Sequence, residues 1–331
     1  MKQTSHTWAL VLAAGDGRRL SALTTDTAGR AVPKQYCTLG GGPTLLQSAM
    51  ARGQAVAEAG RVSVVVAAEH RRWWWRALQH LPARNVVVQP RNCGTANGML
   101  LQLLHIEQAD PEAEIVMLPS DHLVSDETVL ANAMSRALLR IRAAPQEVVL
   151  LGMAPEAPDP ELGYIVPGPP DQQGICKVLT FVEKPALATA ARLIEHGALL
   201  NAFIMVARCR TLLELFARAR PDILSLMRQA MDFHNDRKAA LAKLYAQLPI
   251  LDFSRQILGK ATDSALRVEP VADCGWSDLG TPERIGRAIS RMTRAGRVPA
   301  RQFVNVERGI DLAARYQQLR PETLPEQRAT A

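Results

Sequence analysis

Short apolar runs alternate with longer segments of helical periodicity through the first half of the chain. The apolar runs have the length and the β-branched content of buried strands, at residues 8–13, 62–67, 85–89, 114–118 and 147–153. Apolar positions recur at helical spacing in the segments between them, at residues 44–58, 71–81, 95–107 and 126–143. This order predicts an α/β fold whose mostly parallel sheet is flanked by helices on both faces and binds ligands beyond the carboxyl ends of its strands.

The pattern changes after residue 153, where two proline-rich stretches, 154–160 and 166–174, enclose a short apolar segment. A second lobe is expected from this point, with a strand at 178–183, a helix near 187–196, an apolar segment at 200–206 and helices to about 244. We therefore expect a core at 1–153, a second lobe at 154–292 that returns to the core, and a carboxyl-terminal arm at 293–331. Residues 320–331 are rich in Pro, Glu and Thr and are expected to fray.

Composition narrows the class of protein only slightly. The 39 Lys and Arg exceed the 32 Asp and Glu, which favours anionic ligands, but no basic block interleaved with aromatics indicates a nucleic-acid partner. Five cysteines at scattered spacings, without a CxxC pair, are typical of reduced thiols in a cytoplasmic protein. No stretch of about 18 apolar residues predicts a membrane span, and the apolar residues 8–14 are expected to form a buried strand, not a leader peptide.

A glycine-bearing turn follows the first predicted strand, in the run Leu12-Ala13-Ala14-Gly15-Asp16-Gly17-Arg18-Arg19-Leu20. Such turns expose backbone N–H groups to phosphate, and glycine avoids holding the ligand away and permits positive φ. The spacing excludes the dinucleotide fingerprint, whose third glycine would stand at Leu20, and the P-loop, which needs Gly-Lys-Ser/Thr. Arg18 and Arg19 suit a polyphosphate. The glycines alone are equally typical of a plain turn with arginines facing solvent.

A proline-stiffened loop downstream presents one lysine, in Val32-Pro33-Lys34-Gln35-Tyr36. The two elements in this order resemble the amino-terminal signature of the sugar-1-phosphate nucleotidylyltransferases, L-A-G-G-x-G-T-R-L followed by P-K-Q. The Lys-Gln-Tyr form is most similar to the mannose-1-phosphate guanylyltransferase branch of that family.

Further matches follow in the family's order across roughly residues 8 to 290. They are Gln89-Pro90-Arg91-Asn92-Cys93-Gly94-Thr95-Ala96 (family Q-P-x-N-R-G-T-A), Pro119-Ser120-Asp121-His122 (P-S-D-H), Gly163-Tyr164-Ile165 (from G-Y-G-Y-I), Phe181-Val182-Glu183-Lys184-Pro185 (F-x-E-K-P), the segment that begins at Asn201 (N-S-G-M-F-V), Leu251-Asp252-Phe253-Ser254 (from S-I-D-Y-A) and Trp276-Ser277-Asp278-Leu279-Gly280 (W-S-D-x-G). So many matches in one order favour the family over chance similarity.

The resemblance implies a Rossmann-like, glycosyltransferase-A-like nucleotidyltransferase fold, with a nucleotide-binding core and a smaller sugar-binding lobe. It implies that GTP and mannose 1-phosphate yield GDP-mannose and pyrophosphate by a magnesium-assisted in-line attack on the α-phosphate. The residues that it assigns are Arg19 and Lys34 for catalysis; Leu12, Ala13, Ala14, Gly15, Gly17, Arg18, Gln89, Asn92, Gly94, Thr95, Ser120 and Asp121 for the nucleotide; Gly163, Tyr164, Glu183, Lys184, Asn201 and Asp252 for the sugar phosphate; and Asp121 and Asp278 for Mg²⁺.

Several positions depart from the family pattern. Arg18 stands where threonine is usual, Ala14 replaces a glycine, and Cys93 replaces an arginine. Four more departures are expected near the sugar, namely Phe203 at a glycine position, Glu161 and Leu162 in the G-Y motif, and Ile257 at an acidic position. Transfer from UTP, ATP or dTTP to another sugar 1-phosphate, and a nucleotide-sugar-binding homologue with weak turnover, therefore stay open as alternatives. The sequence does not decide whether the chain self-associates.

Overall fold

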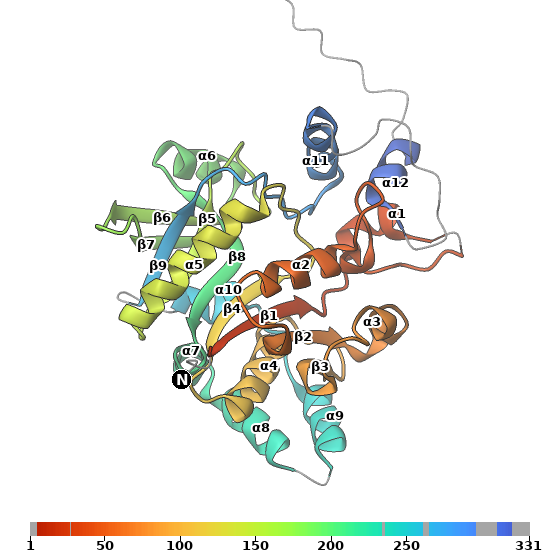
Figure 1. Cartoon of the computed structure of the whole chain (residues 1–331), viewed down its shortest axis with the longest axis vertical. Helices are drawn as coiled ribbons and strands as arrows, with labels where there is room; N and C mark the ends of the chain where they lie inside the picture. Colours follow the sequence, from red (N-terminus) through yellow and green to blue (C-terminus); the bar gives the residue numbers. More distant parts are fainter. Residues whose placement is uncertain (1–4, 27, 234–235, 261–264, 296–309, 320–331) are drawn as a thin grey trace, which may run out of the picture.

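One nine-stranded sheet forms the centre of the molecule (Figure 1). The computed structural model describes residues 5–26, 28–233, 236–260, 265–295 and 310–319, without the side chains of Arg18 and Lys260. The strand order across the sheet is β3-β2-β1-β4-β8-β5-β9-β7-β6. The strands are β1 (Thr7–Ala13), β2 (Val62–Ala67), β3 (Val86–Gln89), β4 (Glu114–Pro119), β5 (Val148–Met153), β6 (Gly163–Pro170), β7 (Cys176–Glu183), β8 (Leu199–Arg208) and β9 (Leu266–Val271).

Parallel pairing is confined to two parts of the sheet. Strands β3, β2, β1 and β4 are parallel neighbours, and β5 is parallel to β9. Strand β8 runs antiparallel to both β4 and β5, and β6 and β7 form an antiparallel hairpin, so the sheet as a whole is mixed. The two faces of β2, β4 and β5 are buried along their whole length, which explains why these strands appear in the sequence as unbroken apolar runs.

Helices cover both faces of the sheet. The longer ones are α2 (Leu45–Gln54), α3 (Arg71–Ala77), α4 (Thr95–Ala109), α5 (Glu127–Ala143), α6 (Leu187–Glu195), α7 (Cys209–Ala219), α8 (Pro221–Asp232), α9 (Arg237–Gln247), α11 (Pro282–Arg294) and α12 (Leu312–Leu319), with short α1 (Ser21–Thr24) and α10 (Phe253–Gln256). Helices α2, α3, α5, α6, α11 and α12 contribute to one apolar core, and α4, α7, α8, α9 and α10 contribute to the other. Figure 1 shows α2 and α5 crossing one face of the sheet, with α8 and α9 at the opposite side of the molecule.

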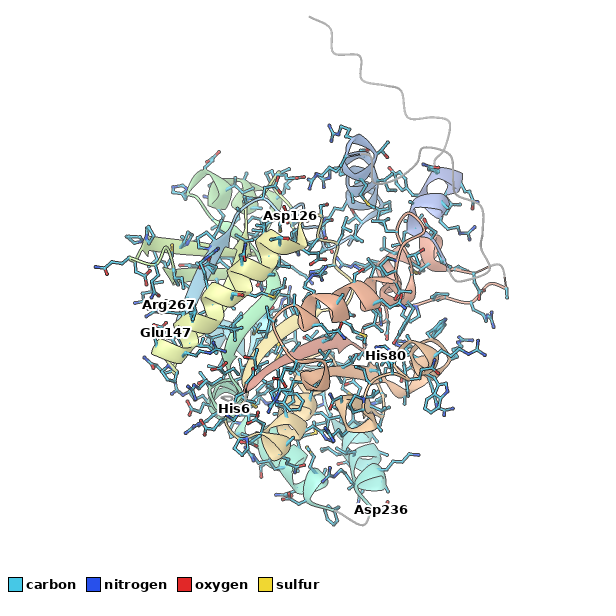
Figure 2. All side chains as sticks on the ribbon, in the orientation of Figure 1. His6, His80, Asp126, Glu147, Asp236 and Arg267 are labelled. Carbon is cyan, nitrogen blue, oxygen red and sulfur yellow. The ribbon has the colours of Figure 1, made fainter. Side chains whose placement is uncertain are left out.

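The five strands and four helices predicted for the first half are all present, with shifted ends. Helices α2 and α3 end earlier than their apolar periodicity predicts, because the chain turns into 3-10 segments before β2 and β3. Helix α5 begins one residue late because Asp126 is its N-cap and accepts hydrogen bonds from Thr128 and Val129 N–H (Figure 2). In the second half, the predicted strand, helix and apolar segment correspond to β7, α6 and β8.

The sheet also extends across the predicted boundary at residue 153. Strands β8 and β9 come from the later region, yet β8 lies between β4 and β5 at the middle of the sheet. The division into core, lobe and arm therefore stays a prediction. Much of the expected arm, including the tail that was expected to fray, lies outside the described residues.

Ion pairs link β5 and β9 to α5. Glu147, just before β5, pairs with Arg140 of α5 and, at 2.8 Å, with Arg267 of β9; Figure 2 labels Glu147 and Arg267. Glu147 is 3% exposed, so its charge depends on these guanidinium partners.

Helix α4 packs against α7 and α8 and contains a histidine in a low-polarity setting. Burial, together with the nearby charge of Arg237, lowers the pKa of His105 from 6.5 to about 4. The folded chain therefore keeps His105 neutral in a pH range where the unfolded chain protonates it. The lowered pKa of His105 contributes stability to the fold at pH values above 6.5. This contribution is lost as the pH falls from 6.5 toward 4.

We expect His105→Gln to reduce the loss of unfolding free energy between pH 6.5 and pH 4. The expected reduction is about 3 kcal/mol at most, the value of a shift of this size. Urea unfolding at several pH values measures it, and the exposed His80, labelled in Figure 2, supplies the control His80→Gln. An equal pH dependence in the wild type and His105→Gln would contradict the assignment.

Candidate active site

An open cleft of about 1320 Å³, counting the solvent at its mouth, brings the sequence motifs together. It lies past the carboxyl ends of β1, β3 and β4, where the doubly wound arrangement predicts a ligand. The residues of the sequence prediction that line it are Leu12, Ala14, Gly15, Gly17, Arg19, Gln89, Asn92, Gly94, Thr95, Ser120, Asp121, Gly163, Glu183, Lys184, Asn201, Asp252 and Asp278.

The glycine turn after β1 is held against the lysine loop. Gly17 has φ +64°, and a Cβ there would lie 3.1 Å from the backbone nitrogen of Lys34, so a larger residue would push the two segments apart. The buried amide of Gln35 donates hydrogen bonds of 3.0 Å to the carbonyl oxygens of Ala13 and Gly15. Gln35 therefore fixes the shape of the turn, a role that its place in the P-K-Q match did not reveal.

The ammonium of Lys34 joins two segments that are distant in the sequence. Its Nζ lies 2.8 Å from Oδ2 of Asp121 and donates a hydrogen bond of 2.5 Å to the backbone oxygen of Asp278. Burial alone would raise the pKa of Asp121, but the charge of Lys34 holds that pKa below its usual value. Lys34 is itself only 5% exposed and lies beneath Asp121, outside the cleft lining.

Arg284, in the first turn of α11, binds the carboxylate of Asp278. Its Nη1 lies 2.5 and 2.6 Å from the two carboxylate oxygens, and its Nη2 lies 2.6 Å from Oδ2 of Asp159. Burial favours the neutral form of Asp278, yet the neighbouring Arg284 and Lys34 keep its pKa lowered. No sequence motif indicated that Arg284 joins Asp278 to Asp159. Asp159 stands in a proline-rich loop that matches none of the family's patterns.

His122 is neutral in this site. The indole N–H of Trp276 donates a hydrogen bond of 3.2 Å to His122 Nδ1, which can accept it only when unprotonated. Burial lowers the pKa of His122 to about 4, although Asp121 and Asp278 oppose the shift. The contact links the loop after β4 to the segment that precedes α11.

The second nucleotide motif forms the entry to α4. Gly94 has φ +89°, and a Cβ would lie 2.3 Å from the carbonyl oxygen of Leu251, so only glycine fits. Asn92 accepts a hydrogen bond from Gly94 N–H, and Thr95 accepts one from Phe253 N–H. Gln89 is 1% exposed, and its Oε1 has no hydrogen-bond partner in the described part of the chain. A buried acceptor of this kind at a cleft wall suits a ligand donor.

The sugar-side motifs meet through the β6–β7 hairpin. Gly163 lies opposite Glu183 in the hairpin register, and a Cβ on Gly163 would lie 2.6 Å from Glu183 Oε2. Burial, with the negative charge of Asp252, raises the pKa of Glu183. Asn201 accepts a hydrogen bond of 3.1 Å from Phe203 N–H.

Four residues of the sequence prediction are not among those lining the cleft. Ala13 and Lys34 lie behind it, and the side chain of Arg18 is not described. Tyr164 is fully buried, and its hydroxyl bonds the backbone N–H and C=O of Asp159. The structure thus places Tyr164 as a support for the Asp159 turn, outside the cleft lining.

The departures from the family motifs have structural explanations in part. Cys93 and Ile257 are each 1% exposed and pack into the core, where an arginine or an acid would be buried.

Glu161 forms an ion pair with Arg19, and both residues line the cleft. A ligand that uses Arg19 must therefore displace Glu161. Because both side chains are about half exposed, this contact is weak.

The comparisons with known proteins agree with this geometry. The model of the nucleotidyl transferase family matches residues 8–294, so the chain belongs to that family. Within that family, the chain is similar to mannose-1-phosphate guanylyltransferases, which confirms the resemblance inferred from the motifs.

Three relatives illustrate the similarity. The mannose-1-phosphate guanylyltransferase of Escherichia coli (strain K12) is 29% identical over 91% of this chain and 63% of its own length. The xanthan biosynthesis protein XanB of Xanthomonas campestris pv. campestris (strain B100) is 30% identical over 82% of this chain and 57% of its own. The crystal structure of mannose-1-phosphate geranyltransferase from Thermus thermophilus is 27% identical, with a TM-score of 0.75 over 86% of this chain and 80% of that one.

The chain thus spans about three-fifths of the length of these two curated relatives. The fold comparison also confirms the expected α/β nucleotidyltransferase fold.

Among the described residues, every helix is too short or too polar to cross a bilayer.

Phe203 occupies a backbone conformation that favours glycine. It has φ +55°, lines the cleft, and packs edge-on against Phe253 with ring centroids 6.2 Å apart. The glycine usual at this position in the family would adopt the conformation without strain. The aromatic contact with Phe253 offsets part of that strain here.

We expect Phe203→Gly to be more stable to urea than Phe203→Ala, by about 1 kcal/mol. Both variants lose the contact with Phe253, so the difference between their unfolding free energies reports the cost of the left-handed backbone conformation. At the neighbouring Ala202, which is buried in β8 without a positive φ, the change Ala202→Gly should instead lower the stability relative to the wild type. A Phe203→Ala variant as stable as Phe203→Gly would argue against strain at this residue.

Proposed function

We propose that this chain transfers a nucleoside monophosphate from a nucleoside triphosphate to a sugar 1-phosphate and releases pyrophosphate, with GTP and mannose 1-phosphate as its substrates. The observation that carries the proposal is the contact of Lys34 with both Asp121 and Asp278 at one cleft. On one side of these residues lies a glycine turn suited to phosphates, and on the other lies a set of polar groups suited to a hexose.

The cleft offers a separate place for each part of the substrates. Backbone N–H groups of the Gly15–Gly17 turn and the amino-terminal end of α4 favour anionic phosphates. The unpartnered Oε1 of Gln89 suits an N–H of the base. Glu183 and Asn201 supply acceptors for hexose hydroxyls, and Lys184 supplies a cation for the sugar phosphate. The choice of guanine and mannose rests on the relatives, of which one is a mannose-1-phosphate guanylyltransferase.

The main requirement of the reaction is to offset the negative charges of the reacting phosphates, and proton transfer matters less. A phosphate oxygen of the sugar 1-phosphate attacks the α-phosphorus, and the bond from that phosphorus to the β-phosphate bridging oxygen breaks. The nucleophile is already ionised near neutral pH, so a neutral His122 is compatible with turnover. We assign Arg19, which lines the cleft and contacts Glu161 through Nη1, to the departing pyrophosphate. Lys34 holds Asp121 in position and adds positive charge beneath the phosphates.

The acidic residues of the cleft fit a divalent cation. Among the described side chains, the carboxylates of Asp121, Asp159 and Asp278 pair with two permanent cations, Lys34 and Arg284, which leaves one net negative charge. Asp121 and Asp278 are the hard oxygen ligands that would hold Mg²⁺ there. When bound, the ion would neutralise phosphate charge and stabilise the transition state.

A weakly active nucleotide-sugar-binding homologue is the second candidate function. One observation favours it, because Arg284 contacts both carboxylate oxygens of Asp278 and so competes with a metal ion. The bulky Phe203 at the sugar side of the cleft supports the same candidate. Binding of a GDP-sugar without release of pyrophosphate would distinguish it.

We expect a panel of GTP, UTP, ATP and dTTP against several sugar 1-phosphates to give the highest kcat/KM with GTP and mannose 1-phosphate. Pyrophosphate release in the presence of Mg²⁺ is the readout. Preference for another pair would revise the substrates and keep the reaction class. Absence of release with every pair, together with tight binding of GDP-mannose, would favour the second candidate function.

Asp121→Asn should lower kcat by roughly 100-fold or more, because it removes a carboxylate from the expected metal site. Asp121 suits this test better than Asp278, since Lys34 keeps the backbone oxygen of Asp278 as a partner when Asp121 is changed, whereas the loss of Asp278 would leave the Nη1 group of Arg284 without its carboxylate. Asp232→Asn, at the exposed end of α8, is the matched control and should leave kcat unchanged. Near-normal turnover of a folded Asp121→Asn variant would remove Asp121 from the mechanism.

A further inference from the structure

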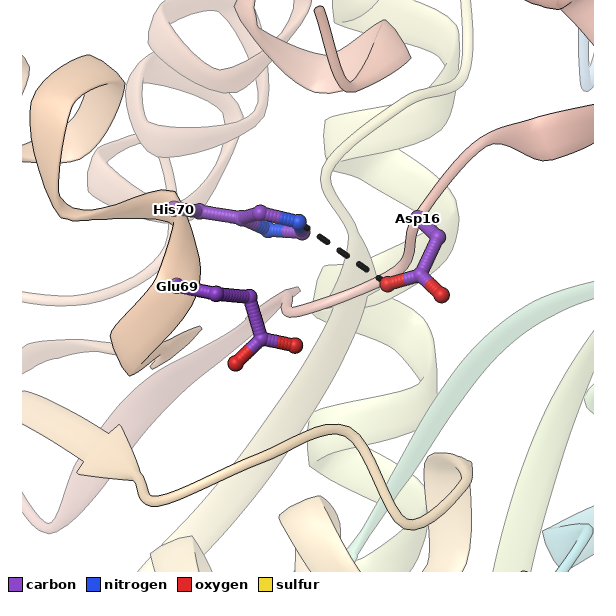
Figure 3. A group of neighbouring side chains, drawn as sticks. All are labelled: Asp16, Glu69 and His70. Atoms are coloured by element: carbon purple, nitrogen blue, oxygen red, sulfur yellow. Dashed lines mark ion pairs between the residues drawn. The ribbon is translucent and has the colours of Figure 1, made fainter. Parts of the chain in front are cut away.

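Three possible ligand side chains meet beside the glycine turn, and none of them is among the residues that line the cleft (Figure 3). Asp16 belongs to the turn itself, and Glu69 and His70 belong to the 3-10 segment between β2 and α3. One oxygen of each carboxylate and one ring nitrogen of His70 all lie within 4.8 Å of one another. The sequence motifs assigned no role to any of the three.

His70 provides the second observation. Its side chain is 8% exposed, its ring is directed toward Asp16 in Figure 3, and its Nδ1 has no hydrogen-bond partner in the described ranges. Its Nε2 lies 3.8 Å from Asp16 Oδ1, which is too far for a hydrogen bond. The position open to an ion is therefore at Nε2, because this nitrogen faces the carboxylate of Asp16 without a hydrogen bond to it.

The surroundings hold the ring in place and keep it neutral. Tyr36 and Trp73 meet His70 edge-on, with ring centroids at 6.3 and 5.7 Å. Burial is the main cause that lowers the pKa of His70, and the neutral form is the one that binds metals. The amide of Asn92 donates to Asp16 Oδ1 at 3.2 Å, so the carboxylate is positioned from the cleft side as well.

We propose that Asp16, Glu69 and His70 form a second metal site, separate from Asp121 and Asp278, for a divalent transition metal of the Zn²⁺ class. One imidazole nitrogen with two carboxylate oxygens is a donor set that Zn²⁺ or Co²⁺ prefers and that Mg²⁺ does not. Closing the ligand atoms around an ion requires only a small movement, because Glu69 is exposed and can rotate. The bound ion gives the ring a partner and joins the glycine turn to the start of α3.

This assignment does not depend on the proposed transferase activity. A cation at this position would fix the Gly15–Gly17 turn from behind and leave the N–H groups on the cleft side open to phosphate. The metal therefore acts on the stability of the turn, and its binding is measurable without substrates.

The experiment uses the full chain carrying Asp121→Asn, so that the acidic site in the cleft is weakened. After chelator treatment, the protein is dialysed against Zn²⁺, and bound metal is counted by mass spectrometry. We expect one Zn²⁺ per chain, retained in excess Mg²⁺, and a melting temperature raised by a few degrees. Co²⁺ should show visible d–d absorption without a thiolate charge-transfer band, because the five cysteines are buried and free.

Glu69→Gln should weaken Zn²⁺ binding at least 10-fold, and His70→Gln should abolish it. Glu58→Gln and His80→Gln alter exposed side chains of the same types and should bind as the parent does. Because His70 is buried, its variant could fail to fold, and Glu69→Gln then decides the question. Absence of stoichiometric Zn²⁺, unchanged affinity in Glu69→Gln, or a thiolate band with Co²⁺ would overturn the proposal.

Discussion

The contact of one buried ammonium with two acidic segments is the constraint on which the cleft depends. A buried ammonium needs polar partners, and Lys34, which is 5% exposed, has them in Asp121 and the backbone of Asp278. This requirement brings the lysine loop, the end of β4 and the segment before α11 to one point. Asp278 is held in turn by Arg284, which also binds Asp159, so the charge network reaches the proline-rich loop.

Backbone strain is concentrated around the same point. In the described chain, the residues other than glycine with positive φ are Lys184, Phe203 and Leu279. Two of them line the cleft, and the third follows Asp278 directly. Conformations of this kind persist where packing over-determines them, and they are typical of ligand-binding sites. The cleft therefore combines the charged contacts of Lys34 with backbone conformations that the surrounding sheet and helices impose.

The glycine turn is fixed from two sides. Gln35 holds it through the carbonyl oxygens of Ala13 and Gly15, while Asn92 holds the carboxylate of Asp16. The cluster of Asp16, Glu69 and His70 includes a residue of the same turn. A turn built on glycines needs such external support, because its glycines would otherwise be free to adopt many conformations.

Local patterns in the sequence determined the strands and helices of the first half. A strand buried on both faces is an unbroken apolar run, and a helix buried on one face has apolar residues at helical spacing, so both can be recognised from the sequence. The ordered motifs likewise indicated the family and most residues of the cleft. Only the tertiary structure decided that β8 lies antiparallel at the middle of the sheet and that Tyr164 supports a turn. It alone revealed the contact of Arg284 with Asp278 and the meeting of Asp16 with His70. These contacts are set by how the sheet and its connecting loops pack, and neither periodicity nor motif spacing encodes which side chains become neighbours there.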